Sequence, residues 1–265
     1  MDGGGRKAGK QSRFASLYHP PYLRFSAAPV RGNVLASRSM ALFPAMPTLN
    51  AELAAWRNGF RLVAGVDEVG CGPLAGPVVA AAVILDPGAV RRWWCELRDS
   101  KRLDEDQRER LSALLRAECA YGIGSASHAY IDEYGLTAAR KQAMRVAVAA
   151  LPQRPQMLLI DAVSLPEYRH RAIIHGDAVV ASIAAASIVA KVARDATMAA
   201  HAESFPQYGF ERNRGYATPH HKRALDEHGP CTIHRRLFAP VRAALEAHGL
   251  SVPATASTGA VPALA

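Results

Sequence analysis

An almost unbroken apolar run, PVVAAAVIL at residues 77–85, constrains the fold of this chain more than any other stretch. Such a run has no polar face to turn toward water, so it is typical of a strand that is buried on both sides. The preceding stretch at residues 61–67, RLVAGVD, is apolar nearly to its end, and we interpret it as a second strand. The sequence therefore predicts a sheet that is covered by helices.

Helix and strand patterns alternate after these two strands. Asp104 opens an acid-rich first turn, which favours a helix start, and Pro152 ends a later helical pattern. Proline after Thr218 sits well at a first helical position. We predict further strands at residues 120–127, 156–161 and 170–177, and helices at 104–120, 137–151, about 180–202 and from 219 onward. This order predicts an α/β fold, a mixed sheet flanked by helices with a C-terminal helical part.

The two ends of the chain differ in composition from the part between them. Residues 1–45 are rich in Gly, Arg, Ser and Pro and lack periodicity, so we predict a disordered N-terminal extension. These residues are rich in arginine and nearly free of acids, which also fits an organelle transit peptide. We favour a disordered extension, or a true translation start at Met40 or Met46. Residues 46–248 are the predicted globular domain, and residues 249–265 are a predicted disordered tail.

The net charge of +9 is distributed unevenly over the 265 residues. Residues 1–45 carry seven basic residues and one acid, so the rest of the chain is only weakly basic. Within residues 169–242, however, eleven Lys and Arg residues stand against six Asp and Glu residues. This local excess fits either a face that binds a polyanion such as nucleic acid or an ordinary solvated surface.

The four cysteines, Cys71, Cys95, Cys119 and Cys231, form no C-x-x-C pair and no metal-type spacing with histidine. Scattered thiols in a chain of this size indicate a reducing compartment, so we expect a cytoplasmic protein. No apolar run approaches the roughly 18 residues of a membrane span, so no membrane partner is expected.

Acidic residues follow three of the predicted strands: the pair Asp67 and Glu68, then Asp161, then Asp177. If these strands are neighbours, four carboxylates meet at one edge of the sheet, where unpaired burial would be very costly. Because the ligands are oxygen atoms without cysteine, Mg²⁺ or Mn²⁺ is the expected partner. Two such ions suit in-line phosphoryl transfer, in which one activates water and the other stabilises the leaving 3′-oxygen.

Each acid also has a structural interpretation. A single Asp at a strand end commonly forms a turn or caps a helix, and Asp177 precedes the alanine-rich helix closely enough to cap it. Two adjacent acids cannot both cap, which weakens this interpretation for Asp67 and Glu68. Asp195 lies 18 residues after Asp177, roughly 27 Å along a continuous helix, so we interpret it as a structural partner of Lys191.

Nine segments in order now resemble bacterial ribonuclease HII, over about residues 61–242. Many such segments in one order make the resemblance highly specific. They are GVDEVGCGPLAGPVVAAAVIL (65–85), DSKRL (99–103), IDA (160–162), HGD (175–177), AAASIVAKVARD (184–195), FPQYGF (205–210), RGYATPHH (214–221), EHG (227–229) and HRRLFAPV (234–241).

The resemblance implies a ribonuclease H-like fold, with a five-stranded mixed sheet in a catalytic domain at residues 46–248. It implies an endonuclease that hydrolyses RNA in RNA–DNA hybrids and cuts 5′ of single ribonucleotides in duplex DNA, leaving 5′-phosphate and 3′-hydroxyl ends. By position, the catalytic metal ligands would be Asp67, Glu68, Asp161 and Asp177, the same four acids reached above. The partner would be nucleic acid, and we expect the protein to act as a monomer.

The resemblance also implies substrate contacts. Glycines let the main chain approach a ligand closely, so Gly70, Cys71 and Gly72 are expected near the ribose, where a 2′-hydroxyl distinguishes RNA from DNA. Ser100 and Lys101 match a segment near the scissile backbone, and Lys101 is an expected phosphate contact. Tyr216 matches a tyrosine that stacks at the junction of RNA and DNA.

Four residues depart from the family pattern. Cys71 stands where the family usually has arginine. If that arginine helps to hold phosphate or ribose, Cys71 should weaken binding or junction selectivity, and if mainly the backbone makes the contact, Cys71 should matter little. A redox-sensitive thiol is a further interpretation of Cys71. His175 and Arg214 stand where lysine is usual, and Ala162 stands where many members have glycine.

Other functions remain to be distinguished. One alternative is a non-catalytic module that binds RNA–DNA hybrids and has lost activity through Cys71. The intact set of four acids argues against it, because binding alone does not need four metal ligands. The sister type, ribonuclease HIII, usually carries an added N-terminal domain, for which residues 1–45 are too short. Another nuclease or a transposase of the same fold is disfavoured by the glycine loop and the RGYAT segment.

Overall fold

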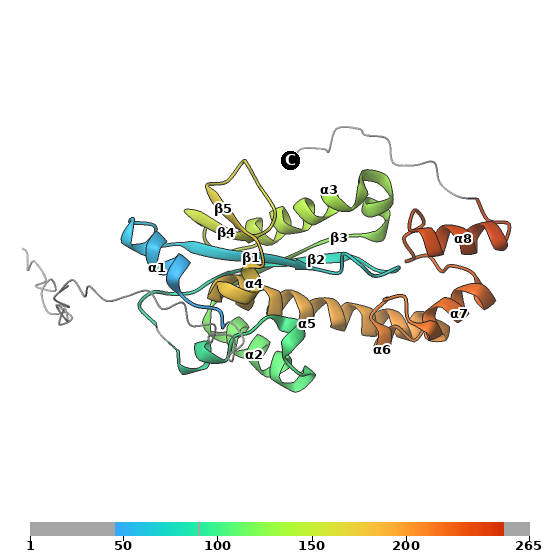
Figure 1. Ribbon diagram of the computed structural model, residues 1–265, viewed down its shortest axis with the longest axis horizontal. Helices are drawn as coiled ribbons and strands as arrows, with labels where there is room; N and C mark the ends of the chain where they lie inside the picture. The colour runs from blue at the N-terminus through green and yellow to red at the C-terminus, as the bar shows by residue number, and fades with distance from the viewer. Residues whose placement is uncertain (1–45, 90, 252–265) are drawn as a thin grey trace, which may run out of the picture. The chain divides into compact units, whose positions relative to one another are not determined.

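The computed structural model describes residues 46–89 and 91–251. Within them, five strands form one mixed sheet in the order β3-β2-β1-β4-β5 (Figure 1). β1 (Val63–Val69) lies antiparallel to β2 (Val78–Ile84) and parallel to β4 (Met157–Asp161). β3 (Ala120–Ala126) extends the antiparallel side of the sheet, and β5 (His170–Ile173) extends the parallel side. The predicted five-stranded mixed sheet is confirmed.

Helices cover both faces of this sheet, as the unbroken apolar pattern of β2 predicts. α3 (His128–Ala149) packs on one face, and α5 (Ala181–Ser204), with α2 (Glu105–Glu118) beside it, packs on the other (Figure 1). The side chains of β2 alternate between the two layers, so Ala82 lies in the core under α3 and Ala81 in the core under α5. Both faces of β2 are therefore buried, and its residues are fully apolar.

α5 approaches the middle of the sheet very closely. A Cβ atom added at Gly65 of β1 would lie 2.1 Å from the carbonyl carbon of Ser182 in α5. No side chain larger than hydrogen fits at this position. The glycine thus lets α5 lie directly over β1, two residues before Asp67.

Two helix starts were predicted correctly from local chemistry. The Asp104 carboxylate accepts a hydrogen bond from the Gln107 N–H at 2.8 Å, and the Gln107 side chain accepts one from the Asp104 N–H at 3.2 Å. This reciprocal capping box fixes the start of α2. The Thr218 hydroxyl caps α7 (Pro219–His228), in which proline occupies the first position.

The boundaries of β1 and α3 differ from the prediction. β1 ends at Val69, so Asp67 and Glu68 lie inside the strand and pair with β2 rather than following the strand end. α3 begins at His128, well before residue 137, because the Ser127 hydroxyl caps it. Gly135, at φ 82° and ψ 163°, interrupts the helix, and the regular apolar spacing begins only after this break.

The prediction that Asp177 ends a strand is wrong. β5 stops at Ile173, and the chain turns at His175, which has a left-handed φ of 56°. Asp177 therefore lies in the short helix α4 (Gly176–Val179).

Asp177 does not cap α5 either. Val180 precedes the first residue of α5 and provides no side-chain cap. The Glu52 carboxylate of α1 (Asn50–Arg57) instead accepts a hydrogen bond from the Ser182 N–H at 2.7 Å. The capping interpretation of Asp177 is thus excluded, and its carboxylate is left for another role.

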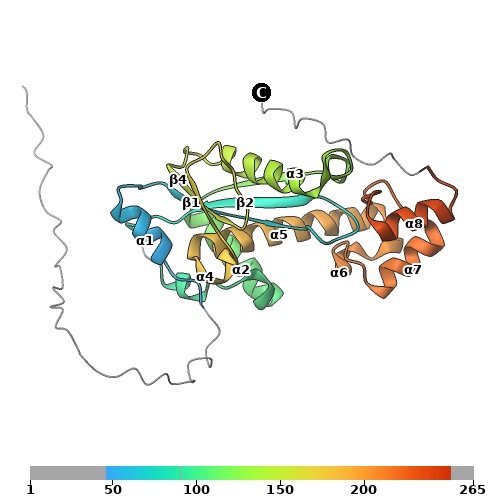
Figure 2. The same ribbon diagram turned by 45° about the horizontal axis from the view of Figure 1, so that its top comes forward.

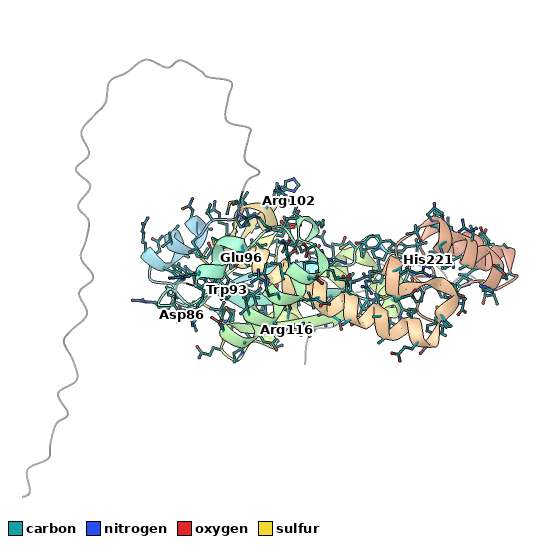
Figure 3. The ribbon with its side chains drawn as sticks, turned by 90° about the horizontal axis from the view of Figure 1, so that it is seen from below. Asp86, Trp93, Glu96, Arg102, Arg116 and His221 are labelled. Carbon is teal, nitrogen blue, oxygen red and sulfur yellow. The ribbon has the colours of Figure 1, made fainter. Side chains whose placement is uncertain are left out.

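The C-terminal helices pack around a separate small core (Figure 2). Leu74 and Ala75, from the loop after β1, belong to the same core, so this loop is anchored between the sheet and the C-terminal part. Figure 3 shows His221 of α7 among these helices, whereas Trp93 lies at the other end, beside α2. The remaining elements are η1 (Arg92–Glu96), η2 (Ser100–Arg102), η3 (Pro206–Tyr208), α6 (Phe210–Asn213) and α8 (Ala239–Ala247).

Among the described residues, no helix is both long enough and apolar enough to cross a membrane. The predicted extension at residues 1–45 lies outside the described part of the chain, and so do residues 252–265 of the predicted tail.

Candidate active site

A cavity of about 270 Å³ opens beside the C-terminal half of β1. Its walls come from β1, β4, η2, α4, α5 and the loop after β1, so segments far apart in the sequence meet there. All ten residues predicted for the site line this cavity, although their roles stay predictions. They are Asp67, Glu68, Gly70, Cys71, Gly72, Ser100, Lys101, Asp161, Asp177 and Tyr216.

The two adjacent acids of β1 have different neighbours, because successive side chains of a strand point to opposite faces. Asp67 belongs to the side of α5, where the Ser187 hydroxyl interacts with it. Glu68 faces α3, where Arg140 donates to its Oε1 from Nε at 2.7 Å and from Nη2 at 2.6 Å. One acid is therefore surrounded by carboxylates, while its neighbour is neutralised by a cation.

The other two acids are brought in by the parallel side of the sheet. Asp161 is the last residue of β4, and its Oδ1 accepts a hydrogen bond from the Gly176 N–H at 2.7 Å. This bond ties β4 to the first turn of α4, which carries Asp177. The Oδ2 of Asp177 lies 3.5 Å from Lys101 Nζ of η2. The four acids thus reach one cavity, as the sequence predicts, but Asp177 reaches it through a turn and α4.

The electrostatics of the cavity favour a cation. Burial raises the pKa of Asp67 well above its usual value, and the charges of Glu68, Asp161 and Asp177 raise it further. Burial also raises the pKa of Glu68, against the opposing effect of Arg140. The pKa of Asp177 is raised by burial and by Asp99, while Lys101 opposes the shift. Each carboxylate would be stabilised by a positive ion, since clustered and buried negative charges are costly.

The donor set fits a hard divalent cation. All the acids supply oxygen atoms, which Mg²⁺ and Mn²⁺ prefer. Glu68 Oε2 is buried and has no hydrogen-bond partner in the described part of the chain, so one oxygen is left over for a ligand. Among residues 46–89 and 91–251, no three His, Cys, Asp or Glu side chains are arranged as a ready metal cage. Joint ligation by the four acids therefore requires side chains to move, above all Glu68, which Arg140 holds.

The loop after β1 and Tyr216 form one rim of the cavity. Gly72 is exposed, and a Cβ added there would lie 3.6 Å from the Tyr216 ring. Tyr216 is 47% exposed, so its ring is open to solvent beside the cavity. Such a ring beside an acidic cavity suits stacking against a nucleobase or sugar.

Cys71 points back toward the acids. Its Sγ lies 3.5 Å from Glu68 Oε1, and burial together with the Glu68 charge raises the pKa of the thiol to about 12. The thiolate is the reactive form of cysteine, so these surroundings disfavour the redox interpretation of this residue.

Ser100 and Lys101 of η2 also line the cavity. The Ser100 hydroxyl is buried and lies 3.0 Å from the Ser187 hydroxyl of α5, which fixes η2 against the helix. The Lys101 side chain is 76% exposed, and its Nζ lies near both Asp99 and Asp177. A cation that is exposed at the cavity mouth is free to reach a phosphate.

The structural interpretation of Asp195 is confirmed. Both of its carboxylate oxygens accept from Lys191 Nζ, at 2.6 and 2.7 Å, one turn earlier on α5. Arg214 Nε lies 3.9 Å from the same carboxylate. Asp195 does not line the cavity and is already paired.

Sequence reasoning missed Arg140, Ser187 and Arg194. Arg140 lies 72 positions from Glu68, and no local pattern links the two residues. Ser187 and Arg194 do carry a weak signal, because they are polar residues on the mostly apolar face of the predicted alanine-rich helix. Their burial on α5 places both of them at the cavity.

Comparisons with known proteins agree with this geometry. The family model for ribonuclease HII matches residues 64–241. A ribonuclease HII from Sinorhizobium fredii is 47% identical over 223 residues, which are 83% of this chain and 93% of the relative. One from Parvibaculum lavamentivorans is 56% identical over 69% of this chain and 68% of the relative. The crystal structure of a ribonuclease H2 from Pyrococcus horikoshii OT3 superposes with a TM-score of 0.61 at 28% identity, covering 69% of this chain and 97% of that one.

Proposed function

The chain belongs to the ribonuclease HII family, and from this premise we propose that it cuts duplex DNA on the 5′ side of a single embedded ribonucleotide. Family membership makes it an enzyme, a ribonuclease H that acts as an endonuclease on RNA–DNA hybrids. The finer activity is supported by one arrangement: the loop after β1, with Gly72 exposed, and the exposed Tyr216 line the same cavity as the four acids.

The four acids are the proposed ligands of two divalent ions, Mn²⁺ or Mg²⁺. When bound, the ions would supply the positive charge that activates the attacking water and stabilises the leaving 3′-oxygen. Asp67 and Glu68 come from the central strand β1, where both residues pair with β2. The Asp161 carboxylate accepts a hydrogen bond from the Gly176 N–H, and this bond connects β4 to α4, the helix that carries Asp177. We propose that hydrolysis leaves a 5′-phosphate and a 3′-hydroxyl, as the resemblance to the family implies.

Two groups of residues that line the cavity are the proposed substrate contacts. We propose that Lys101 binds a phosphate and that Ser100 holds η2 in position through Ser187. The main chain of Gly70, Cys71 and Gly72 is the proposed contact of the ribose, where the 2′-hydroxyl distinguishes RNA from DNA. Tyr216 is placed to stack beside that sugar. We further propose that the enzyme acts as a monomer in the cytoplasm and removes ribonucleotides during DNA replication and repair.

Three duplexes test this proposal: DNA with one ribonucleotide, a uniform RNA–DNA hybrid, and DNA alone, each with Mg²⁺ and with Mn²⁺. We expect one cut 5′ of the single ribonucleotide, multiple cuts in the hybrid and none in DNA. Mapping the ends should give a 3′-hydroxyl on the DNA and a 5′-phosphate on the ribonucleotide. Cleavage of the hybrid alone would contradict the junction activity. Tight binding without any product would favour a non-catalytic binding module.

A further inference from the structure

Arg235 binds the glycine loop, which we define as residues 70–77, through its carbonyl groups. Its guanidinium donates from Nη2 to the Gly70 carbonyl at 2.6 Å, from Nη1 to that of Cys71 at 3.0 Å and from Nε to that of Gly76 at 3.0 Å. The side chain is completely buried. A single arginine thus holds both ends of the loop.

Arg194 binds the same loop from α5. It donates from Nε to the Pro77 carbonyl at 3.1 Å and from Nη2 to that of Ala75 at 3.3 Å. Its Nη1 donates to the Arg214 carbonyl at 3.0 Å, two residues before Tyr216. This side chain is 1% exposed, so it connects the loop and the tyrosine segment from inside the protein.

Neither guanidinium uses a carboxylate for these contacts. Every acceptor named above is a main-chain carbonyl, and the carboxylate next to Arg194, that of Asp195, is taken by Lys191. Burial lowers the pKa of both arginines, and Arg194 contributes to lowering that of Arg235 to about 10. Arginine is not deprotonated in proteins near neutral pH, so both guanidinium groups are cations. Two buried cations that lie side by side are costly, and a fold that needed only packing could use apolar residues here.

The geometry of the peptide shows what this arrangement achieves. In a trans peptide the carbonyl of one residue and the N–H of the next point in opposite directions. Because the carbonyls of Gly70 and Cys71 point inward to Arg235, the N–H groups of Cys71 and Gly72 must point away from it. Within residues 46–89 and 91–251, these two N–H groups donate no hydrogen bond to the protein. Successive free N–H groups form a site for an anion or a hydroxyl oxygen.

We propose that Arg194 and Arg235 are positioning residues that hold the glycine loop by its carbonyls and thereby present the N–H groups of Cys71 and Gly72 to the ribonucleotide. This inference rests on the proposed function. It adds that substrate recognition by the loop is set from inside the protein, by two arginines that touch no substrate. Arg194 also binds the carbonyl of Arg214, two residues before Tyr216. It therefore fixes the position of the Tyr216 segment relative to the glycine loop.

Conservative variants test the inference, because lysine keeps the charge but cannot bond several carbonyls in one plane. We would measure KM and kcat of Arg235→Lys and Arg194→Lys on DNA with one ribonucleotide, with Arg145→Lys as a matched control remote from the loop. Arg145 pairs with Glu167 on the other side of the sheet. We expect KM to rise about tenfold in the two loop variants while kcat changes less, and no change in the control.

Two further measurements separate positioning from general stability. Hydrogen exchange should accelerate at residues 70–77 but not in β2, and calorimetric Mn²⁺ affinity should stay at the wild-type value. If Arg235→Lys fails to fold, Arg194→Lys decides. Unchanged KM in a folded variant would overturn the inference, as would equal acceleration of exchange in β2 or weakened Mn²⁺ binding. If the wild-type protein cut no substrate, the proposed function would be refuted instead. Hydrogen exchange at residues 70–77 in the two variants would still test whether the arginines hold the loop.

Discussion

Arg140 donates from two nitrogen atoms to a single oxygen of Glu68, at 2.7 and 2.6 Å, and leaves the second oxygen of that carboxylate buried without a partner in the described structure. The pair joins α3 to β1 on the face of the sheet that α3 covers. It neutralises one of the four acids, and it selects which oxygen of Glu68 is available to a ligand.

Replacing Arg140 by methionine should steepen the pH dependence of metal binding. Arg140 opposes the effect of burial on the Glu68 pKa, so its loss raises that pKa further. Glu68 then holds its proton to a higher pH, and an ion must displace it. We expect Mn²⁺ affinity to fall more between about pH 8 and about pH 6 in Arg140→Met than in wild type. Calorimetric titration over this range measures the effect.

Arg140→Lys is the matched control, since it keeps a cation beside Glu68. Its pH dependence should stay near that of the wild type. Parallel curves for Arg140→Met and wild type would show that Arg140 does not control the protonation of Glu68.

Asp67→Asn should stabilise the metal-free protein at neutral pH. The pKa of Asp67 is raised in the fold, so the folded state binds a proton more tightly than the unfolded state. Stability therefore decreases as the pH rises above the unfolded-state pKa, and it is lowest once the folded carboxyl is ionised. We expect the amide to add about 1–2 kcal/mol to the free energy of unfolding at about pH 8 in EDTA, and much less at about pH 4.

Urea unfolding at the two pH values measures this difference. Asp86→Asn is the control, because Asp86 is exposed and follows β2 at the opposite end of the sheet. An Asp67→Asn protein that is less stable than wild type at about pH 8 would contradict the view that the acids repel one another without a metal.

Cys71→Arg should strengthen binding without changing selectivity. The loop presents its N–H groups whatever the side chain at residue 71, whereas an added guanidinium contacts phosphate, which carries no information on the sugar. We expect KM to fall by a similar factor for DNA with the single ribonucleotide and for the uniform hybrid. The slope of log affinity against log salt concentration should become steeper by about one. Cys71→Ser is the neutral control. A change of more than about tenfold in the ratio of the two kcat/KM values would place selectivity in the side chain.

Ala162→Gly should stabilise the fold. Ala162 directly follows Asp161 and has a left-handed φ of 49°, where a Cβ atom is unfavourable by roughly 1–2 kcal/mol. Part of the gain is offset by the greater flexibility of glycine in the unfolded chain, so we expect about 0.5–1 kcal/mol of added stability in thermal or urea unfolding. Ala113→Gly, at an exposed position inside α2, should have the opposite sign at similar size. If Ala162→Gly lowered the stability, the view that Ala162 has a strained backbone would be wrong.

The sequence predicted those parts of the fold whose cause is local. The apolar run of β2, the acid-rich helix start at Asp104 and the proline after Thr218 each act within a few residues, and all three predictions were confirmed. The start of α3 was missed because Gly135 interrupts its periodicity. The end of β5 was missed because His175 adopts a left-handed turn that its residue type does not indicate.

The candidate site was predictable in its residues but not in their pairings. The four acids were found because they follow apolar runs, and the structure brings them to one cavity. The contact of Arg140 with Glu68 depends on how α3 crosses the sheet, and the carbonyl contacts of Arg235 span more than 150 residues. Such long-range polar contacts leave no periodic trace in the chain.

The role of the four acids is tested by the cleavage rate of DNA with a single ribonucleotide, measured in Mn²⁺ for the amide variant of each acid. The variants are Asp67→Asn, Glu68→Gln, Asp161→Asn and Asp177→Asn, with Asp86→Asn as the acid outside the site. Our account predicts that each of the four loses at least about a hundredfold in rate while still binding the duplex, and that Asp86→Asn cuts like wild type at the 5′ side of the ribonucleotide. Wild-type rates in any two of the four variants would contradict it.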